Sequence, residues 1–177
     1  MALYLENLDE RTRRLMLDEV EYDLSHNQLH ISPFLSGQGQ HDYLNLLRDA
    51  IQNGSDQTLA QDLRNHRRIT RAMPRRKPKG GFTVTGTPEN AADVLAESEF
   101  NRYYIRALAR RAIEDGIPEL VIYRAKPAKR PRPISEALIE TTVAPNLILD
   151  DLRSHPGTFP AFGVPAGPNS GLSVRLP

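Results

Sequence analysis

The sequence FNRYYIRALARR, residues 100–111, carries the clearest helical pattern in the chain. Its apolar residues recur at helical spacing and share one face, formed by Phe100, Tyr103, Tyr104, Ala107 and Leu108. Arginines follow at four-residue intervals on the opposite face, at Arg102, Arg106 and Arg110. The stretch predicts a helix with an apolar underside and an exposed basic ridge. The ridge either lies on a phosphate backbone or pairs with nearby acids, namely Glu99, Glu114 or Asp115.

The helical pattern extends on both sides of this stretch. Residues 87–89, Thr-Pro-Glu, supply a cap, a proline for the first position and an acidic first turn. Residues 116–118, Gly-Ile-Pro, end the pattern after Asp115. The apolar spacing weakens near Ser98, so the sequence is consistent with one long helix or with two.

Beyond this helix the sequence predicts a mixed segment. ELVIYRAK, residues 119–126, is the best strand in the chain because it is β-branched and aromatic and follows a helix stop. The basic stretch 126–133 contains three prolines and is expected to lie outside any sheet. Residues 135–143 are ambiguous between helix and strand, and residues 145–155 predict a short helix.

Before this helix the sequence predicts three helices, at about residues 8–25, at 40–53 and from residue 56 onward. Two glycines, Gly37 and Gly39, are expected to loosen the chain ahead of the second of these. Residues 82–85 read as a short strand.

These elements indicate an α+β fold, of a size that one domain with a single core can use. We expect a helical N-terminal half and a small mixed C-terminal half, followed by an extended arm rich in proline and glycine. The boundaries are a helical region at 1–63, a basic linker or arm at 64–81, a mixed α/β region at 82–155 and the C-terminal arm at 156–177.

Composition excludes several classes of protein. The 177 residues include no cysteine, so disulfides, thiolate metal sites and cysteine nucleophiles are excluded. No apolar run approaches the roughly 18 residues of a membrane span, and the N-terminal sequence lacks the apolar region of a secretory signal. We therefore expect no membrane partner.

The net charge of +1 conceals a segregated distribution. Residues 1–63 hold eleven acidic and four basic residues, whereas residues 64–79 hold eight basic residues and no acid. Closely spaced cations without acids suit phosphate neutralisation, so this segment is the candidate nucleic-acid or anion site. The alternatives are that this segment contacts an acidic protein surface, or that it is a solvated loop without a partner. The candidate residues are Arg64, Arg67, Arg68, Arg71, Arg75, Arg76, Lys77 and Lys79.

The C-terminal segment is the second candidate site. Large apolar side chains are spread through residues 156–177 among prolines and glycines, a pattern that needs a surface to cover it. Leu172, Val174 and Leu176 alternate with polar residues, as in a strand added to a sheet edge. We expect Phe159 and Phe162 in pockets and the last residues along a sheet edge or groove. The host is either a partner or the protein's own domain.

No catalytic signature is present, and we expect a protein that is not an enzyme and holds no cofactor or metal. His26 and His30 are four residues apart, but the extended pattern around Leu29 and Ile31 breaks the geometry of a helical zinc pair. A serine-nucleophile elbow and a complete phosphate-binding glycine loop are both missing from the sequence. A metal-dependent enzyme is accordingly the least favoured class.

The stretches FNRYYIRAL, VIYRAK and GPNSGLSVRL, within residues 97–177, resemble uncharacterised proteins encoded in phage and prophage structural gene clusters. The resemblance transfers no catalytic residue. It implies a virion component of the head or head-tail region, located in the bacterial cytoplasm or the assembled virion. We thus expect a non-enzymatic assembly protein whose partners are protein subunits, with nucleic acid as a further partner. The alternative is a nucleic-acid-binding regulator that works alone.

Overall fold

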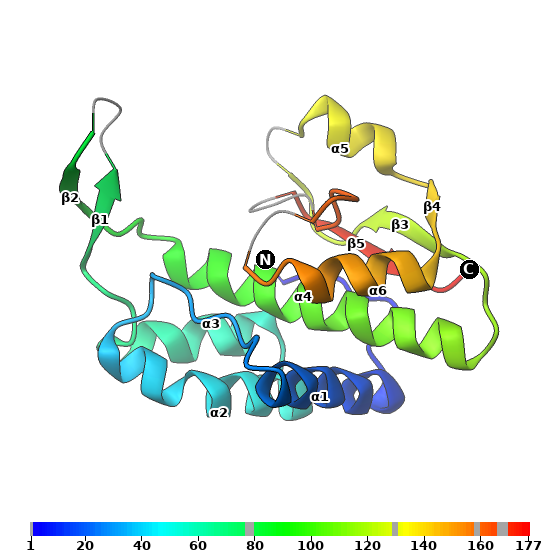
Figure 1. The fold of residues 1–177 in the computed structure, drawn as a ribbon, viewed down its shortest axis with the longest axis horizontal. Coiled ribbons are helices and arrows are strands. Elements are labelled where there is room, and N and C mark those ends of the chain that lie inside the picture. The colour runs from blue at the N-terminus through cyan, green and yellow to red at the C-terminus, as the bar shows by residue number, and fades with distance from the viewer. Residues whose placement is uncertain (1, 77–79, 129–130, 158–159, 166–169) are drawn as a thin grey trace.

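Helix α4 (Ala91–Glu114) runs through the centre of the molecule in the computed structural model (Figure 1). The structure describes residues 2–76, 80–128, 131–157, 160–165 and 170–177. One unbroken helix covers the weak spacing at Ser98, and it begins after Asn90 rather than at the predicted cap at residues 87–89. It packs against helices α1 (Glu10–Ser25), α3 (Asp56–Arg64) and α6 (Pro145–Ser154) and against strand β5 (Leu172–Arg175).

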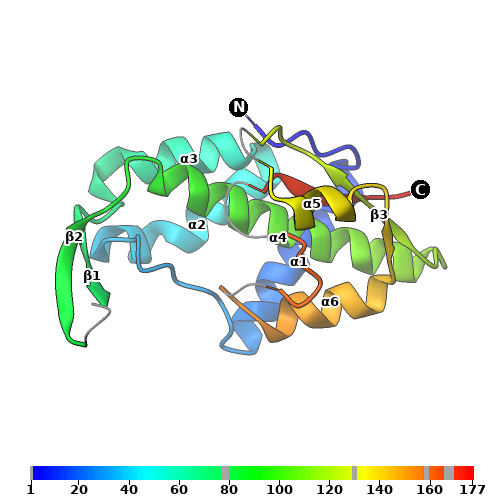
Figure 2. The same cartoon turned by 90° about the horizontal axis from the view of Figure 1, so that it is seen from above.

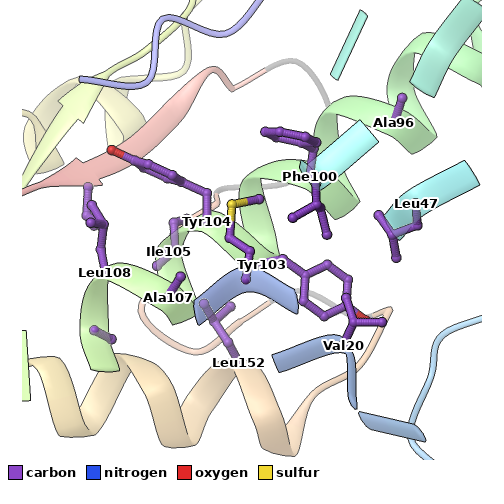
Figure 3. Packing of buried hydrophobic residues seen from close by; sticks show 14 of the residues in the cluster. Val20, Leu47, Ala96, Phe100, Tyr103, Tyr104, Ile105, Ala107, Leu108 and Leu152 are labelled. Carbon is purple, nitrogen blue, oxygen red and sulfur yellow. The ribbon is translucent and has the colours of Figure 1, made fainter. Parts of the chain in front are cut away.

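The predicted basic ridge on α4 is wrong. Arg106 is only 1% exposed and Arg102 only 6% exposed, so both lie inside the molecule. Ile105, Ala109 and Ala112 are also fully buried, which shows that α4 is covered on several sides. Figure 3 shows Phe100 and Tyr103 of α4 among side chains from the surrounding helices, including Val20, Leu47 and Leu152. The aromatic stripe therefore belongs to the core, as expected, but Arg102 and Arg106 do as well. Arg110 is partly exposed and pairs with Glu114, one of the acids expected to meet the arginines.

Arg106 is buried because α1 supplies two acids to meet it. Its Nε donates to Oε2 of Glu19 at 2.8 Å, and its Nη1 donates to Oδ2 of Asp23 at 2.7 Å. The hydroxyl of Tyr103 donates to the same Asp23 oxygen at 2.9 Å, and Nη2 of Arg153 lies 2.5 Å from Oε1 of Glu19. Burial acts to raise the pKa of Glu19, but Arg153 and Arg106 outweigh it and the pKa is lowered. The result is a buried ionic network that joins α1, α4 and α6.

The three N-terminal helices form where the sequence predicts them, with shifted starts. The side chain of Asp9 caps α1 by accepting from the amide of Thr12. Helix α2 (Gly37–Asn53) begins earlier than expected, because Ser36 caps it and both glycines lie in its first turn. Ser55 and Thr58 form a reciprocal capping box at the start of α3.

Gly39 is required in that first turn by a close approach rather than by chain flexibility. A Cβ at this position would lie 2.1 Å from the carbonyl oxygen of Arg68. Because Gly39 has no side chain, Arg68, which follows α3 and the short 3₁₀ helix η1 (Asn65–Arg67), lies directly against α2.

A small antiparallel sheet covers another side of α4. Its strand order is β4 (Thr142–Val143), β3 (Leu120–Arg124), β5, with Ile122 opposite Val174. The ambiguous segment 135–143 contributes to a helix and then a strand, since α5 (Pro133–Leu138) precedes β4. Strand β5 thus pairs with β3, which lies far from it in the sequence.

The fold is α+β, with a helical N-terminal half and the three-stranded sheet in the C-terminal half. One cluster of buried apolar side chains runs from Leu15 in α1 to Val174 in β5, so both halves share a core. No helix in the described part of the chain is long and apolar enough to cross a membrane.

Candidate nucleic-acid interface

Residues 72–76 of the basic segment form one strand of a β-hairpin that stands off one end of the molecule. Strand β1 (Ala72–Arg76) pairs antiparallel with β2 (Phe82–Gly86), with Pro74 opposite Val84. Figures 1 and 2 both show these strands projecting from the end of the helical body. The strand predicted at residues 82–85 is confirmed, whereas the linker expected at residues 64–81 contains a strand. Proline fits β1 because each strand of a two-stranded sheet has a free edge.

Backbone hydrogen bonds anchor the base of the hairpin to the body. The amide of Thr70 donates to the carbonyl of Phe34 at 2.9 Å, and the amide of Ser36 donates to the carbonyl of Arg68 at 2.8 Å. The amide of Thr87 donates to the carbonyl of Arg71 at 3.0 Å and closes the base. The hairpin therefore leaves the body from a fixed origin.

Two of the eight predicted cations are engaged by acids of the protein itself. The side chain of Arg68 is 16% exposed, and its Nε donates to Oδ2 of Asp42 at 2.7 Å. Its Nη1 also donates to the carbonyl of Asp62 at 2.8 Å. Arg64 pairs with Asp93 at the start of α4. The prediction that Arg68 offers its charge to an external anion is corrected, because this guanidinium holds the base of the hairpin.

The remaining cations extend from the base along the hairpin. Arg67, Arg71 and Arg76 are exposed, and none of them has an acidic partner among the residues that the structure describes. Arg75 lies in β1 opposite Thr83. Lys77 and Lys79 lie outside the described residues. No acidic residue occurs between positions 64 and 88, so the positive charge of the hairpin has no acid of its own segment beside it.

The hairpin also has an exposed apolar face that the sequence reasoning missed. Alternation along the strands places Phe82 and Val84 on one face, where they are 72% and 74% exposed. Pro74 lies opposite Val84 and Arg76 opposite Phe82, and both are exposed. The alternation of Phe82 and Val84 with threonines after the glycine pair 80–81 was the signal available for this face, whereas residues 72–76 carry no such alternation.

This arrangement provides three elements of nucleic-acid binding. A two-stranded ribbon fits the major groove of a duplex. Exposed arginines neutralise phosphates, and apolar side chains beside them can contact base edges in the groove. The hairpin combines these elements on an extension that can reach a duplex without interference from the body.

The predicted docking residues of the C-terminal segment lie mostly inside the molecule. Leu172 and Val174 are fully buried in β5, and Leu176 is partly buried against the core. The expected ordered strand is confirmed, and its host is the protein's own β3, so docking of Leu172 and Val174 on a partner is wrong. Phe162 is 39% exposed rather than held in a pocket, and Phe159 lies outside the described residues.

No group of three or more metal-ligating side chains occurs among the residues described. Comparison with protein-family models, curated proteins and solved structures gave no match to the chain.

Proposed function

We propose that this protein is a non-enzymatic nucleic-acid-contacting component of an assembly, and that the hairpin β1–β2 is its contact arm. The observation that carries the proposal is the projection of a ribbon with acid-free positive charge from an otherwise mixed-charge body. Its affinity arises mainly from phosphates, so it depends little on sequence.

The apolar face of the hairpin adds a second contribution. An isolated two-stranded hairpin is marginally stable in water, and large apolar side chains on it are normally covered in use. Phe82 and Val84 are therefore expected to contact the sugar and base edges of a groove while Arg71 and Arg76 contact phosphates.

The test is binding to a fluorescent duplex of about 20 base pairs over a salt series. The double variant Arg71→Gln/Arg76→Gln removes two exposed hairpin cations, and Arg14→Gln/Arg132→Gln removes two exposed cations from the body. At roughly 0.9 per contact on a duplex, the hairpin variant lowers the slope of log affinity against log salt by about 1.8. The body variant leaves the slope unchanged. Equal slopes in all three proteins would refute the proposal.

A second candidate is a protein-assembly arm that docks on an acidic neighbouring subunit, and the exposed Phe82 and Val84 favour it. The resemblance to phage and prophage structural-cluster proteins supports placing that subunit in a virion. Under this candidate, the variant Phe82→Ala/Val84→Ala abolishes assembly and leaves duplex affinity unchanged. Under the first, the same variant weakens duplex binding. A stand-alone regulator would bind duplex as a monomer or dimer without forming larger assemblies.

A further inference from the structure

A cavity of about 310 Å³ is lined by none of the residues of the hairpin arm. About two and a half turns of α4 form its floor, with Val94, Ser98 and Arg102 along the same face. The other walls are formed by His30, residues 32–34, Leu152, Gly157, Pro160, Pro165 and residues 170–171. At roughly 30 Å³ per water molecule, the cavity holds a ligand on the order of ten non-hydrogen atoms.

The walls are largely apolar, and most of their polar groups are already satisfied. Glu97 pairs with Lys126, and Asn101 both donates to the carbonyl of Leu172 and accepts from the hydroxyl of Ser173. Nη2 of Arg102 donates to the carbonyls of Leu152 and His155 at the end of α6. These contacts hold the walls in place and leave few groups available for a ligand.

Glu99 is the exception. Its side chain is 6% exposed, and its only hydrogen-bond partner among the described residues is Nδ1 of His30 at 3.4 Å. A carboxyl that is buried with one long hydrogen bond is costly, and a further partner would offset much of that cost. Glu99 lines the cavity, so a ligand there can supply the partner.

The position of His30 is itself specified by the chain that closes over it. Gly157 has φ of +69°, and a Cβ there would lie 2.4 Å from the imidazole ring. Only glycine satisfies both conditions, so the segment after α6 can press against His30 and hold it beside Glu99.

We propose that this cavity binds a small apolar organic cation, a primary ammonium or amidinium, with its charged head on the carboxylate of Glu99. The apolar walls receive the body of the ligand, and the head donates to the carboxylate oxygen of Glu99 that has no hydrogen-bond partner among the described residues. Glu97 is already paired with Lys126, so Glu99 is the carboxylate of the cavity lining that a ligand cation would meet. Neither Glu99 nor His30 is needed for the hairpin contact, so the two sites fail independently.

Burial raises the pKa of Glu99, while His30 and Arg102 oppose that shift. The other charged or titratable groups that act on it or are affected by it lie on α1, α2 and α4 and are Asp23, Arg106, Tyr43 and Tyr103. A ligand cation favours the ionised carboxylate, so its binding weakens as the pH falls through the raised pKa.

The test uses three probes of one size: benzylamine, benzyl alcohol and benzoate, titrated into the full chain by NMR. Benzylamine is expected to bind most tightly and to shift the amides of Val94, Ser98 and Gly171. Glu99→Gln weakens benzylamine about tenfold and changes benzyl alcohol by less than about twofold. Glu119→Gln, which removes an exposed acid remote from the cavity, changes neither. Val94→Phe narrows the cavity and weakens all binding.

Two results would overturn the proposal: tighter binding of benzoate than of benzylamine, or benzylamine binding that Glu99→Gln does not change. Absence of any shift at the cavity would also overturn it. If Glu99→Gln does not fold, the pH dependence of ligand binding to the unmodified protein tests the proposal instead. Its affinity for benzylamine must then fall as the pH is lowered, while its affinity for benzyl alcohol stays constant.

Discussion

Arg106 is a charged side chain at the centre of an apolar core, and its burial depends on the acids around it. Glu19 and Asp23 are 0% and 3% exposed, so all three charges are removed from water together. Such a network contributes little net stability compared with apolar residues of the same shape, but its partial removal is destabilising. The core therefore accommodates the charge of Arg106 only together with the charges of Glu19 and Asp23.

Replacement of Arg106 by alanine is expected to lower the free energy of unfolding by about 3–5 kcal/mol, because Glu19 and Asp23 would remain buried without their partner. Arg110 lies one turn further along α4, is partly exposed and pairs with acids at 3.4 Å and beyond. Its replacement by alanine should lower the free energy of unfolding by about 1 kcal/mol or less. Urea denaturation measures both. Equal effects would show that the buried network is not formed in solution.

Asp42 provides a pH-dependent contribution at the base of the hairpin. Hydrogen bonds from His41, Gln38 and Arg68 hold the pKa of Asp42 below its ordinary value. A carboxyl with a lowered pKa in the folded state stabilises the fold above its unfolded pKa, near 4, and loses that contribution as the pH falls through the lowered value.

The variant Asp42→Asn should therefore have a lower melting temperature than the unmodified protein at pH 7, and the difference should shrink as the pH falls below about 4. Asp150 is exposed on α6, and Asp150→Asn serves as the control. It should leave the melting temperature unchanged both at pH 7 and below about pH 4. Thermal melts across a pH series provide the comparison. A difference for Asp42→Asn that stays constant with pH would contradict the assigned contact.

At the scale of elements, strand β5 and the hairpin strands β1 and β2 differ in what covers them. Strand β5 is covered by its own sheet and by α4, whereas β1 and β2 contact mainly each other. Strands β2 and β5 both carry alternating apolar residues. Those of β5 are buried because α4 and its own sheet cover them, whereas Phe82 and Val84 of β2 are exposed.

Leu172→Ala and Val174→Ala should each lower the free energy of unfolding by about 2–4 kcal/mol without changing the oligomeric state, because both side chains fill the protein's own core. Phe162→Ala should cost about 1 kcal/mol or less, since that ring is partly exposed. Denaturant melts with light scattering test this pair of expectations. Unchanged stability together with loss of a complex would instead place β5 on a partner.

At the scale of the whole molecule, charge is separated between the hairpin and the N-terminal helices. Asp18, Glu21 and Asp49 are exposed on α1 and α2, while Arg71 and Arg76 are exposed at the hairpin. Fields of this kind extend over tens of ångströms at low ionic strength and are confined to about 8 Å at physiological salt. Two copies can therefore attract one another, arm to body, when salt is low.

Sedimentation velocity should accordingly show weak self-association at about 20 mM salt that disappears at about 300 mM. The variant Arg71→Gln/Arg76→Gln should remain unassociated at both concentrations, and duplex should compete with self-association in the unmodified protein. An oligomer that survives high salt in the variant would mean that another surface joins the copies.

The sequence by itself determined the helices and the main strand, because their periodicity, caps and stops are local. The α+β class, the core positions Phe100, Tyr103 and Tyr104, and the strand character of Leu172 and Val174 all followed from such patterns. The concentration of cations between residues 64 and 79 was equally visible.

Only the tertiary structure decided which surfaces are covered. Spacing alone cannot tell an exposed arginine from Arg106, because the acids that permit its burial lie more than 80 residues away in the sequence. For the same reason, the sequence alone did not show that β5 pairs with β3, that Asp42 binds Arg68 or that Glu99 lines a cavity. Burial and pairing are properties of neighbours in space, and these neighbours come from distant parts of the chain.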